Sequence, residues 1–154
     1  MAIPVTPPIS DTPPQNSVQP VQGLAQITTN ATNTATSATQ VTGLSVTFVV
    51  QPGTKYLIAN LVADSISNSG ANNVIMTVWN GTVGTGTQVG QSTNTAQSGA
   101  KGSLSENYMI LISSLGVSAG SSVTLNVGMH GSGAGTNTLA AAATYPASFW
   151  VDAE

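Results

Sequence analysis

The chain has 154 residues and a mass of 15.4 kDa, which is the size of one domain. Only 5% of the residues are charged and the formal net charge is −3, so the chain lacks the clustered cations that nucleic acids and anionic membranes require. It contains no cysteine, which excludes disulfide bonds and thiolate metal sites, and no apolar run long enough to span a bilayer. We therefore expect neither nucleic acid nor a membrane as a partner.

The first twenty residues hold six of the eight prolines. Each proline fixes φ and removes an amide donor, so this stretch is neither a helix nor a central strand and is expected to run extended. Apolar residues lie between the prolines, which predicts that residues 1–24 form an arm that binds another protein. The residues assigned to this contact are Ile3, Pro4, Val5, Pro7, Pro8, Ile9, Val18 and Val21.

Ordering the arm costs roughly 20 kcal/mol of backbone entropy, more than its few apolar side chains return on burial. We therefore expect the arm to be mobile when free and to be ordered by backbone pairing with a partner. The alternative is a passive, disordered tail.

Residues 25–39 are rich in Thr, Asn and Ala and contain no proline. Threonine favours extended geometry and asparagine disfavours helix interiors, so a polar edge strand and a flexible connector both fit the pattern. We expect a polar connector, with a short strand near residues 25–28. The globular domain is then predicted over residues 40–154.

Apolar and polar residues alternate with a period of two through most of this domain, between clusters of Gly, Asn and Ser. No segment shows sustained helical periodicity. The sequence therefore predicts an all-β fold, an antiparallel β-sandwich or jelly roll of about eight strands that carries the extended Pro-rich N-terminal arm. The expected strands lie within residues 44–50, 54–66, 72–81, 87–92, 105–115, 121–131, 137–144 and 147–154.

Groups that could carry catalysis are few. His130 is the one histidine, and nothing in the spacing of the many serines and of Asp64 or Asp152 singles out a catalytic triad, so His130 is interpreted as a turn or loop residue at a strand end. The glycine-rich stretch at residues 131–135 follows a strand and opens no helix, which indicates a loop and not a phosphate site. We expect no enzymatic activity, no cofactor and no metal.

Aromatic residues are the remaining candidates for a binding surface. Tyr108, Trp79 and Trp150 are assigned either to an interface between subunits or to a surface on which a glycan stacks. For the two tryptophans, packing in the core or at a subunit interface is the favoured interpretation. Because few charges keep the chains apart, we also expect self-association through apolar or aromatic surface.

The stretch TQVTGLSVTFVVQPGTKYLIANLVADSI resembles the opening of small β-domains in minor tail and head-surface proteins of bacteriophages, particularly those that infect actinobacteria. The final stretch, GSGAGTNTLAAAATYPASFWVDAE, is similar to the glycine-rich loop, Ala/Thr strand, proline and last apolar strand of that family. The resemblance covers roughly residues 39–154. It implies a structural role in the virion and a sandwich or jelly roll that trimerises.

The chain departs from the tail-protein pattern because it has no long tail-anchoring region, and the short arm is its only attachment device. This favours a capsid decoration or cement protein, whose partner is the major capsid protein or another virion protein. The alternative is a tail or fibre-tip adhesin that binds host glycan. In both cases the expected location is the virion, on the capsid surface or on the tail.

Overall fold

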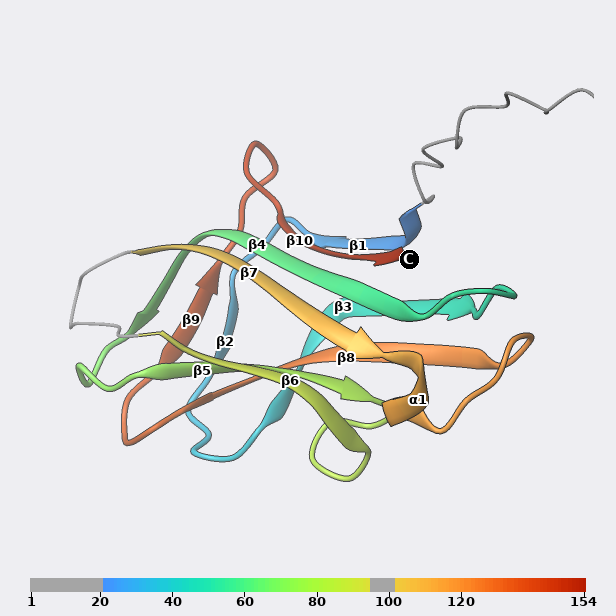
Figure 1. The fold of residues 1–154 in the computed structure, drawn as a ribbon. Coiled ribbons are helices and arrows are strands. Elements are labelled where there is room, and N and C mark those ends of the chain that lie inside the picture. Colours follow the sequence, from blue (N-terminus) through green and yellow to red (C-terminus); the bar gives the residue numbers. More distant parts are fainter. Residues whose placement is uncertain (1–20, 95–101) are drawn as a thin grey trace, which may run out of the picture.

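Two antiparallel sheets pack face to face in the computed structural model of the chain, which describes residues 21–94 and 102–154 (Figure 1). The first sheet has the order β1 (Val21–Ile27), β10 (Ala147–Ala153), β4 (Tyr56–Asn68), β9 (Asn137–Ala140) and β2 (Ala31–Asn33), and β7 (Gly102–Leu111) also pairs with β4. The second has the order β3 (Thr39–Val49), β8 (Ser122–Gly131), β5 (Val74–Asn80) and β6 (Thr87–Asn94). One helical turn, α1 (Ile112–Leu115), follows β7. The predicted all-β antiparallel sandwich is confirmed.

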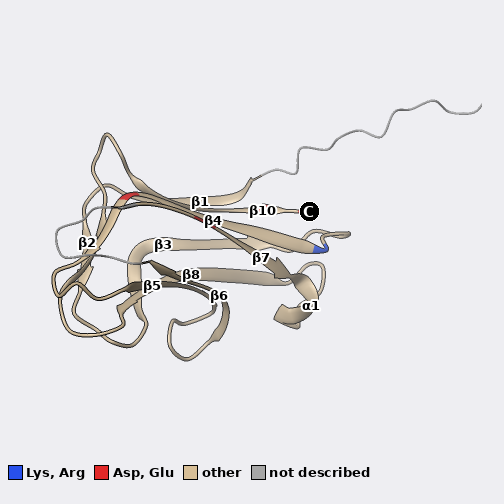
Figure 2. Ribbon diagram, turned by 60° about the vertical axis from the view of Figure 1, so that its left-hand side comes forward, with Lys and Arg blue, Asp and Glu red and all other residues tan. Residues whose placement is uncertain are grey.

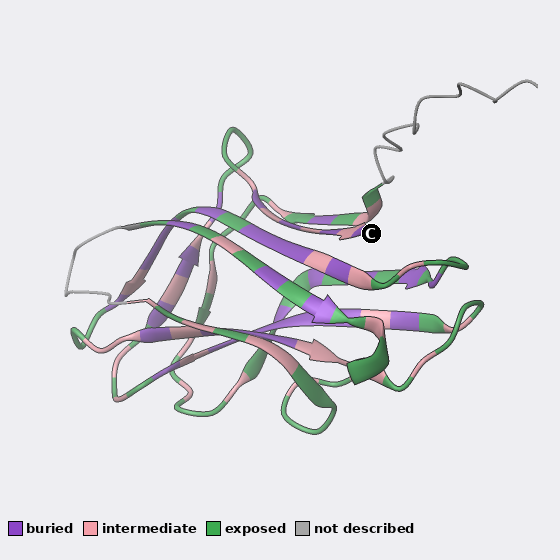
Figure 3. Cartoon of the chain, in the orientation of Figure 1, coloured by how far each residue is buried: buried purple, intermediate pink, exposed green. Residues whose placement is uncertain are grey.

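The core fills the space between the two sheets. Side chains alternate along each strand, so that in β10 Phe149 and Val151 are fully buried while Trp150 between them is half-buried (Figure 3). β3 shows the same pattern from the opposite sheet, with Leu44 and Val46 inside. Each large apolar side chain removed from water in this way stabilises the fold by about 1.5–3 kcal/mol. Each strand therefore turns its apolar face to the core, and the alternation in the sequence specifies which face that is.

β4 is the strand on which the first sheet is built. It pairs with β10 over residues 57–62, with β7 over residues 56–66 and with β9 over residues 65–68. Its core face carries the buried Leu57, Ala59 and Leu61, and its sequence is apolar at consecutive positions because the half-buried Ile58 and the exposed Val62 add apolar residues on the outer face.

The sandwich begins at Val21, and not at residue 40 as the sequence predicted. Residues 21–27 pair with β10, and residues 31–33 pair with β9, so the end of the predicted arm and part of the predicted connector are strands. The polar edge strand, the alternative reading of this segment, is therefore the correct one for β1. It was hard to recognise because Ala25 is its one fully buried side chain, and an edge strand with little buried surface lacks the period-two signal.

Two further segments differ from the prediction. Residues 112–115, expected to continue a strand, form α1, which ends at Gly116 in the left-handed conformation (φ 65°). Residues 141–144 leave β9 and form a turn in which the backbones of Ala142 and Tyr145 exchange hydrogen bonds. These two changes shorten β7 and β9 relative to the expected strands, whereas β1 and β2 raise the number of strands in the described residues to ten instead of about eight.

Buried asparagines connect the strands at one end of the sandwich. Asn137 is fully buried, accepts a hydrogen bond from Asn68 Nδ2 (2.7 Å) and donates through its own Nδ2 to Asn33 Oδ1 (2.8 Å) and to the carbonyl of Ala35 (3.2 Å). Asn33 Nδ2 in turn donates to the carbonyl of Met129 (2.9 Å). The network therefore joins β4, β9, β2 and β8 without using a charge, and all of its buried groups have partners.

Replacing Asn137 by Ala should lower the free energy of unfolding by about 2–4 kcal/mol, because Asn68 Nδ2 would lose its partner inside the protein. Denaturant unfolding of the two proteins measures the difference. Asn73→Ala, at a site outside the network, is the control and should change stability by less than about 0.5 kcal/mol. Equal effects at the two positions would contradict the structural role of the network.

Deleting residues 1–20 should leave the thermal transition unchanged, because β1 stays intact. Deleting residues 1–27 should cost about 3 kcal/mol or more, since the backbone ladder to β10 and the burial of Ala25 are both lost. Differential scanning calorimetry of both truncations tests this boundary. Similar melting of the two truncated proteins would show that β1 is not an integral strand.

Candidate functional site

The arm residues assigned to partner binding, from Ile3 to Val18, lie outside the described residues. Val21, the last of them, is the first residue of β1, where it pairs with Asp152 of β10, and its side chain is 56% exposed. The arm therefore joins the sandwich at one end of an edge strand (Figure 1).

Tyr108 is not available for a surface contact. Its side chain is 7% exposed, its hydroxyl shares a hydrogen bond with Ser92 Oγ (2.9 Å), and a Cβ added at Gly90 would lie 2.6 Å from its ring. Burial raises the pKa of this hydroxyl to about 12. The assignment of Tyr108 to an interface or a glycan surface is therefore corrected: its ring packs where β6 and β7 meet.

Trp79 and Trp150 lie on opposite outer faces of the sandwich. Both are half-buried: Trp79 follows the buried Val78 on β5 of the second sheet, and Trp150 lies between the buried Phe149 and Val151 on β10 of the first. Trp79 Nε1 donates to Thr77 Oγ1 (2.9 Å), and Trp150 Nε1 donates to Asp152 Oδ2 (3.2 Å). Because each tryptophan is next to a core residue of its own strand, Val78 or Val151, its ring lies on the face away from the core, and rings on two different sheets cannot form one stacking surface.

The outer face of the first sheet carries large exposed apolar side chains, of which the sequence singled out Val21 alone, as an arm residue. They come from three strands, at Val21 (56% exposed), Leu24 (59%), Val62 (37%), Met109 (71%) and Leu111 (52%). The strands β1, β10, β4 and β7 lie side by side in this order, with Leu24 opposite Trp150 and Met109 opposite Ile58. We call these five residues the apolar face.

One carboxylate lies in the middle of this surface. Asp152 Oδ2 accepts hydrogen bonds from Asn60 Nδ2 (2.9 Å) and from the Trp150 indole, and Asn107 donates to Asn60 Oδ1. These donors orient the carboxylate, which stays charged, and two further carboxylates lie at the edges of this face: Asp64, exposed two residues after Val62 on β4, and Glu154, which accepts a hydrogen bond from the Tyr56 hydroxyl. Within the described residues Lys55 is the one cation, and it lies at the turn before β4 (Figure 2).

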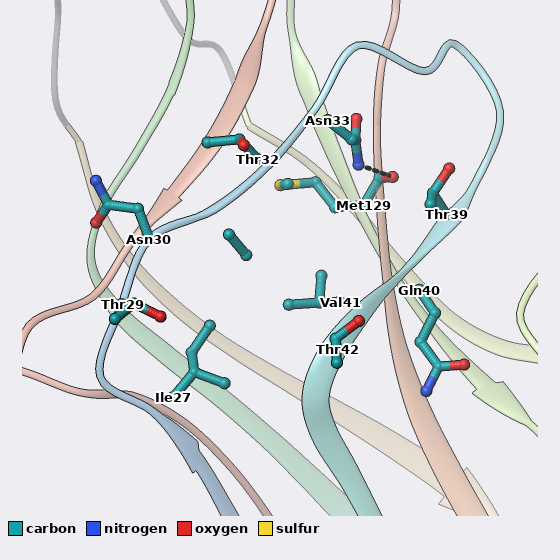
Figure 4. Close-up of a pocket in the computed structure, with 11 residues that line it drawn as sticks. Ile27, Thr29, Asn30, Thr32, Asn33, Thr39, Gln40, Val41, Thr42 and Met129 are labelled. Atoms are coloured by element: carbon teal, nitrogen blue, oxygen red, sulfur yellow. Dashed lines mark hydrogen bonds between the residues drawn. The ribbon is translucent and has the colours of Figure 1, made fainter.

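A pocket of about 320 Å³ opens at the other end of β1, between β1, β2 and β3 (Figure 4). Its lining combines four apolar side chains with seven uncharged polar ones: Ile27, Ala31, Val41 and Met129, and Thr29, Asn30, Thr32, Asn33, Thr39, Gln40 and Thr42. Val41 and Met129 are buried, whereas most of the polar residues are exposed, so the base is apolar and the rim is polar.

The pocket exists because β3 leaves β8 for a few residues. Their pairing is interrupted between Gln40 and Ser45, and Gly43 in this gap has a φ of 90°. A Cβ at Gly43 would lie 2.7 Å from Ile27 Cγ2, so glycine permits both the backbone conformation and the close approach of β1. The sequence signal for the pocket was the Thr- and Asn-rich stretch, which was interpreted as a connector.

Other kinds of site are not evident in the described residues. They contain no group of three or more His, Asp or Glu side chains placed to hold a metal ion. They also contain no helix that is long and apolar enough to cross a membrane. The loop at residues 131–135 follows β8 and leads into β9, so it opens no helix, as the sequence indicated.

Comparison of the chain with protein-family models finds no matching family, and comparison with curated proteins finds no matching relative. The functional conclusion therefore rests on the geometry and chemistry of the apolar face, the arm and the pocket.

His130 lies one residue before the end of β8, so its predicted place at a strand end is correct, but it is a paired residue of the strand and not part of a turn or loop. It is opposite Ile75, and its Nδ1 is buried without a hydrogen-bond partner in the described part of the protein. Burial lowers the pKa of the imidazole below its ordinary value, because the charged form is poorly solvated there.

Acidification should therefore destabilise the protein through His130. Because the folded-state pKa is lower than that of the unfolded chain, about 6.5, the unfolded state binds the proton more readily, and stability falls as the pH drops from 7 towards 5.5. Urea unfolding across this range should show the loss in the wild type and a flatter profile in His130→Gln. If the wild type became more stable as the pH fell over this range, the predicted direction of the stability change would be wrong.

Proposed function

We propose that the protein is a non-enzymatic structural component of a bacteriophage virion: a capsid decoration protein whose arm binds the shell and whose sandwich projects as a trimer. The observation that carries this proposal is the apolar face, which extends to Val21, where the arm joins. Several large exposed apolar side chains on one face of a sheet, even with polar residues between them, are typical of a contact with another protein. The resemblance of residues 39–154 to phage surface domains supports the same class of function.

The apolar face is assigned to the contact between subunits. Its five side chains expose roughly 400 Å² of apolar surface, worth about 10 kcal/mol when covered. Association itself costs about 4–15 kcal/mol, so this surface supports one contact of moderate strength and leaves little for a second partner. Attachment to the shell is therefore assigned to the arm.

Trimerisation would make a weak arm effective. Val21 is part of the apolar face, so association through that face brings the starting points of three arms to one side of the assembly. Simultaneous binding of linked arms raises apparent affinity by about 100-fold or more without any new contact. β1 pairs only with β10 among the described strands, so it is an edge strand of the first sheet, and edge strands are where a strand from another protein can be added.

The proposal is tested with two variants that separate the two contacts. Leu24→Ser combined with Met109→Ser should convert the trimer into a monomer in multi-angle light scattering, because two of the most exposed apolar side chains of the face become polar. Deletion of residues 1–20 should leave the trimer intact but reduce binding to empty capsids of the phage that encodes the chain at least tenfold in co-sedimentation. The monomeric variant should bind these capsids about 100-fold more weakly than the wild type.

Val49→Ser is the matched control, because Val49 is 47% exposed but lies on β3 in the other sheet. It should leave both the mass and capsid binding unchanged. A wild type that is monomeric at micromolar concentration would overturn the assignment of the apolar face. Normal capsid binding by the truncated chain would show that the arm is a passive tail, and electron microscopy that located the chain on the tail would replace the decoration role with that of a tail adhesin.

A further inference from the structure

The pocket between β1, β2 and β3 has the chemistry of a site for an uncharged polar ligand. Ile27, Val41 and Met129 point toward its middle, and polar side chains of the segment between β1 and β2 lie around it (Figure 4). No charged residue lines it. A ligand that fits must therefore have both C–H surface for the base and neutral hydrogen-bonding groups for the rim.

Some polar groups at the rim are already used by the fold. Asn33 is held by Met129, Ala35 and Asn137, and Gln40 Nε2 donates to Asn126 Oδ1 (3.1 Å), which turns its amide away from the pocket (Figure 4). These bonds fix the walls, so the pocket is formed before any ligand arrives. A preformed site loses less free energy on binding than one that must be ordered.

Other groups keep hydrogen-bonding capacity. Asn30 Oδ1 accepts from the amide of Ala141 (2.9 Å), which orients the side chain and leaves its Nδ2 as a donor. In the described structure the hydroxyls of Thr29 and Thr42 make no hydrogen bond, although both residues line the pocket. Each hydroxyl offers one donor and two acceptor positions, so Thr29 and Thr42, on two sides of the pocket, and the Asn30 amide at its outer rim supply both donors and acceptors to a ligand (Figure 4).

We propose that this pocket binds one ring of a neutral saccharide. A pyranose ring has an apolar C–H face and a perimeter of hydroxyl groups, which matches an apolar base surrounded by amides and hydroxyls. The volume of about 320 Å³ is at the lower end of the range for ligand sites and accommodates a single ring. Acidic sugars are excluded, because no cation lines the pocket to pair with a carboxylate.

The same chemistry limits the affinity. The lining has no aromatic side chain on which a ring could stack, so a few hydrogen bonds and a small apolar contact support a dissociation constant in the millimolar range. The inference does not depend on the virion assignment or on the apolar face, which lies on the outer side of the first sheet.

The test is a titration of the isotopically labelled full-length protein, followed by amide chemical shifts in NMR. The probes are the methyl glycosides of glucose, galactose, mannose, rhamnose and N-acetylglucosamine, with glucuronic acid as the charged comparison, each to tens of millimolar. At least one neutral sugar should shift amides of residues 27–33 and 39–42, with an affinity that changes little with salt. Glucuronic acid should not.

Thr29→Val and Thr42→Val remove one hydroxyl each at nearly constant volume and should each weaken binding about fivefold. Asn30→Asp keeps the oxygen that accepts from Ala141 but removes the Nδ2 donor, and it should weaken binding to a similar extent. Thr47→Val is the matched control: Thr47 is also on β3, but its hydroxyl bonds to Thr124 outside the pocket, and the variant should bind normally.

The proposal is overturned if no neutral sugar of the panel shifts these amides at the highest concentration. It is also overturned if the shifts occur around Trp79 or Trp150 instead, or if the three pocket variants bind as the wild type does. A folded spectrum in each variant ensures that a loss of binding reports on the pocket.

Discussion

The hydrogen bonds of Asn137 are the interaction on which this end of the sandwich depends. A chain with so few charges must satisfy its buried polar groups with neutral amides, and Asn137 does so for strands that are distant in sequence. Its bond to Asn33 fixes β2 against β9, and Asn33 in turn fixes the carbonyl of Met129 at the base of the pocket. Because an unpaired amide in a low-dielectric interior is costly, the network selects one arrangement of these strands and rejects slipped ones.

The scarcity of charge also explains why the two proposed contacts differ in kind. On the outer face of the first sheet, the exposed uncharged side chains include the apolar face, which suits a contact with another protein. At the pocket, the exposed uncharged groups are hydroxyls and amides, which suit a ligand that is itself neutral and polar. Neither contact relies on long-range electrostatic attraction, so binding at both should be governed by shape and short-range bonding.

Most of the fold could be predicted from the sequence because the core strands obey the period-two rule. Leu44, Val46 and Phe48 alternate with polar residues and are buried, and β10 behaves in the same way. β1 and β2 could not be recognised with the same certainty, because edge strands bury few side chains and their composition matches that of a linker. The pocket was missed for the same reason, since it is lined by that segment.

The candidate surface residues were harder to predict than the strands. Trp79 and Trp150 occupy similar apolar contexts in sequence, yet they lie on opposite faces because their strands belong to different sheets. Tyr108 is buried because its ring packs against Gly90 and its hydroxyl bonds to Ser92, both on β6. This contact joins two different strands, so the local sequence around Tyr108 does not reveal it. Met109 and Leu111 lie in the last part of β7, where apolar residues are consecutive, and they are exposed because they continue the face that carries Ser105 and Asn107 earlier in the strand.

The antiparallel pairing of β1 with β10 places the start of the sandwich and the end of the chain at the same edge and the same end (Figure 1). The last residue is held there, because the backbone of Glu154 bonds to Lys55 and Tyr56. A peptide fused to the C-terminus would therefore emerge beside the arm, on the side proposed to approach the shell. The turn between β9 and β10, at the far end of β10, is the better insertion point for cargo that is to be displayed outward from a particle.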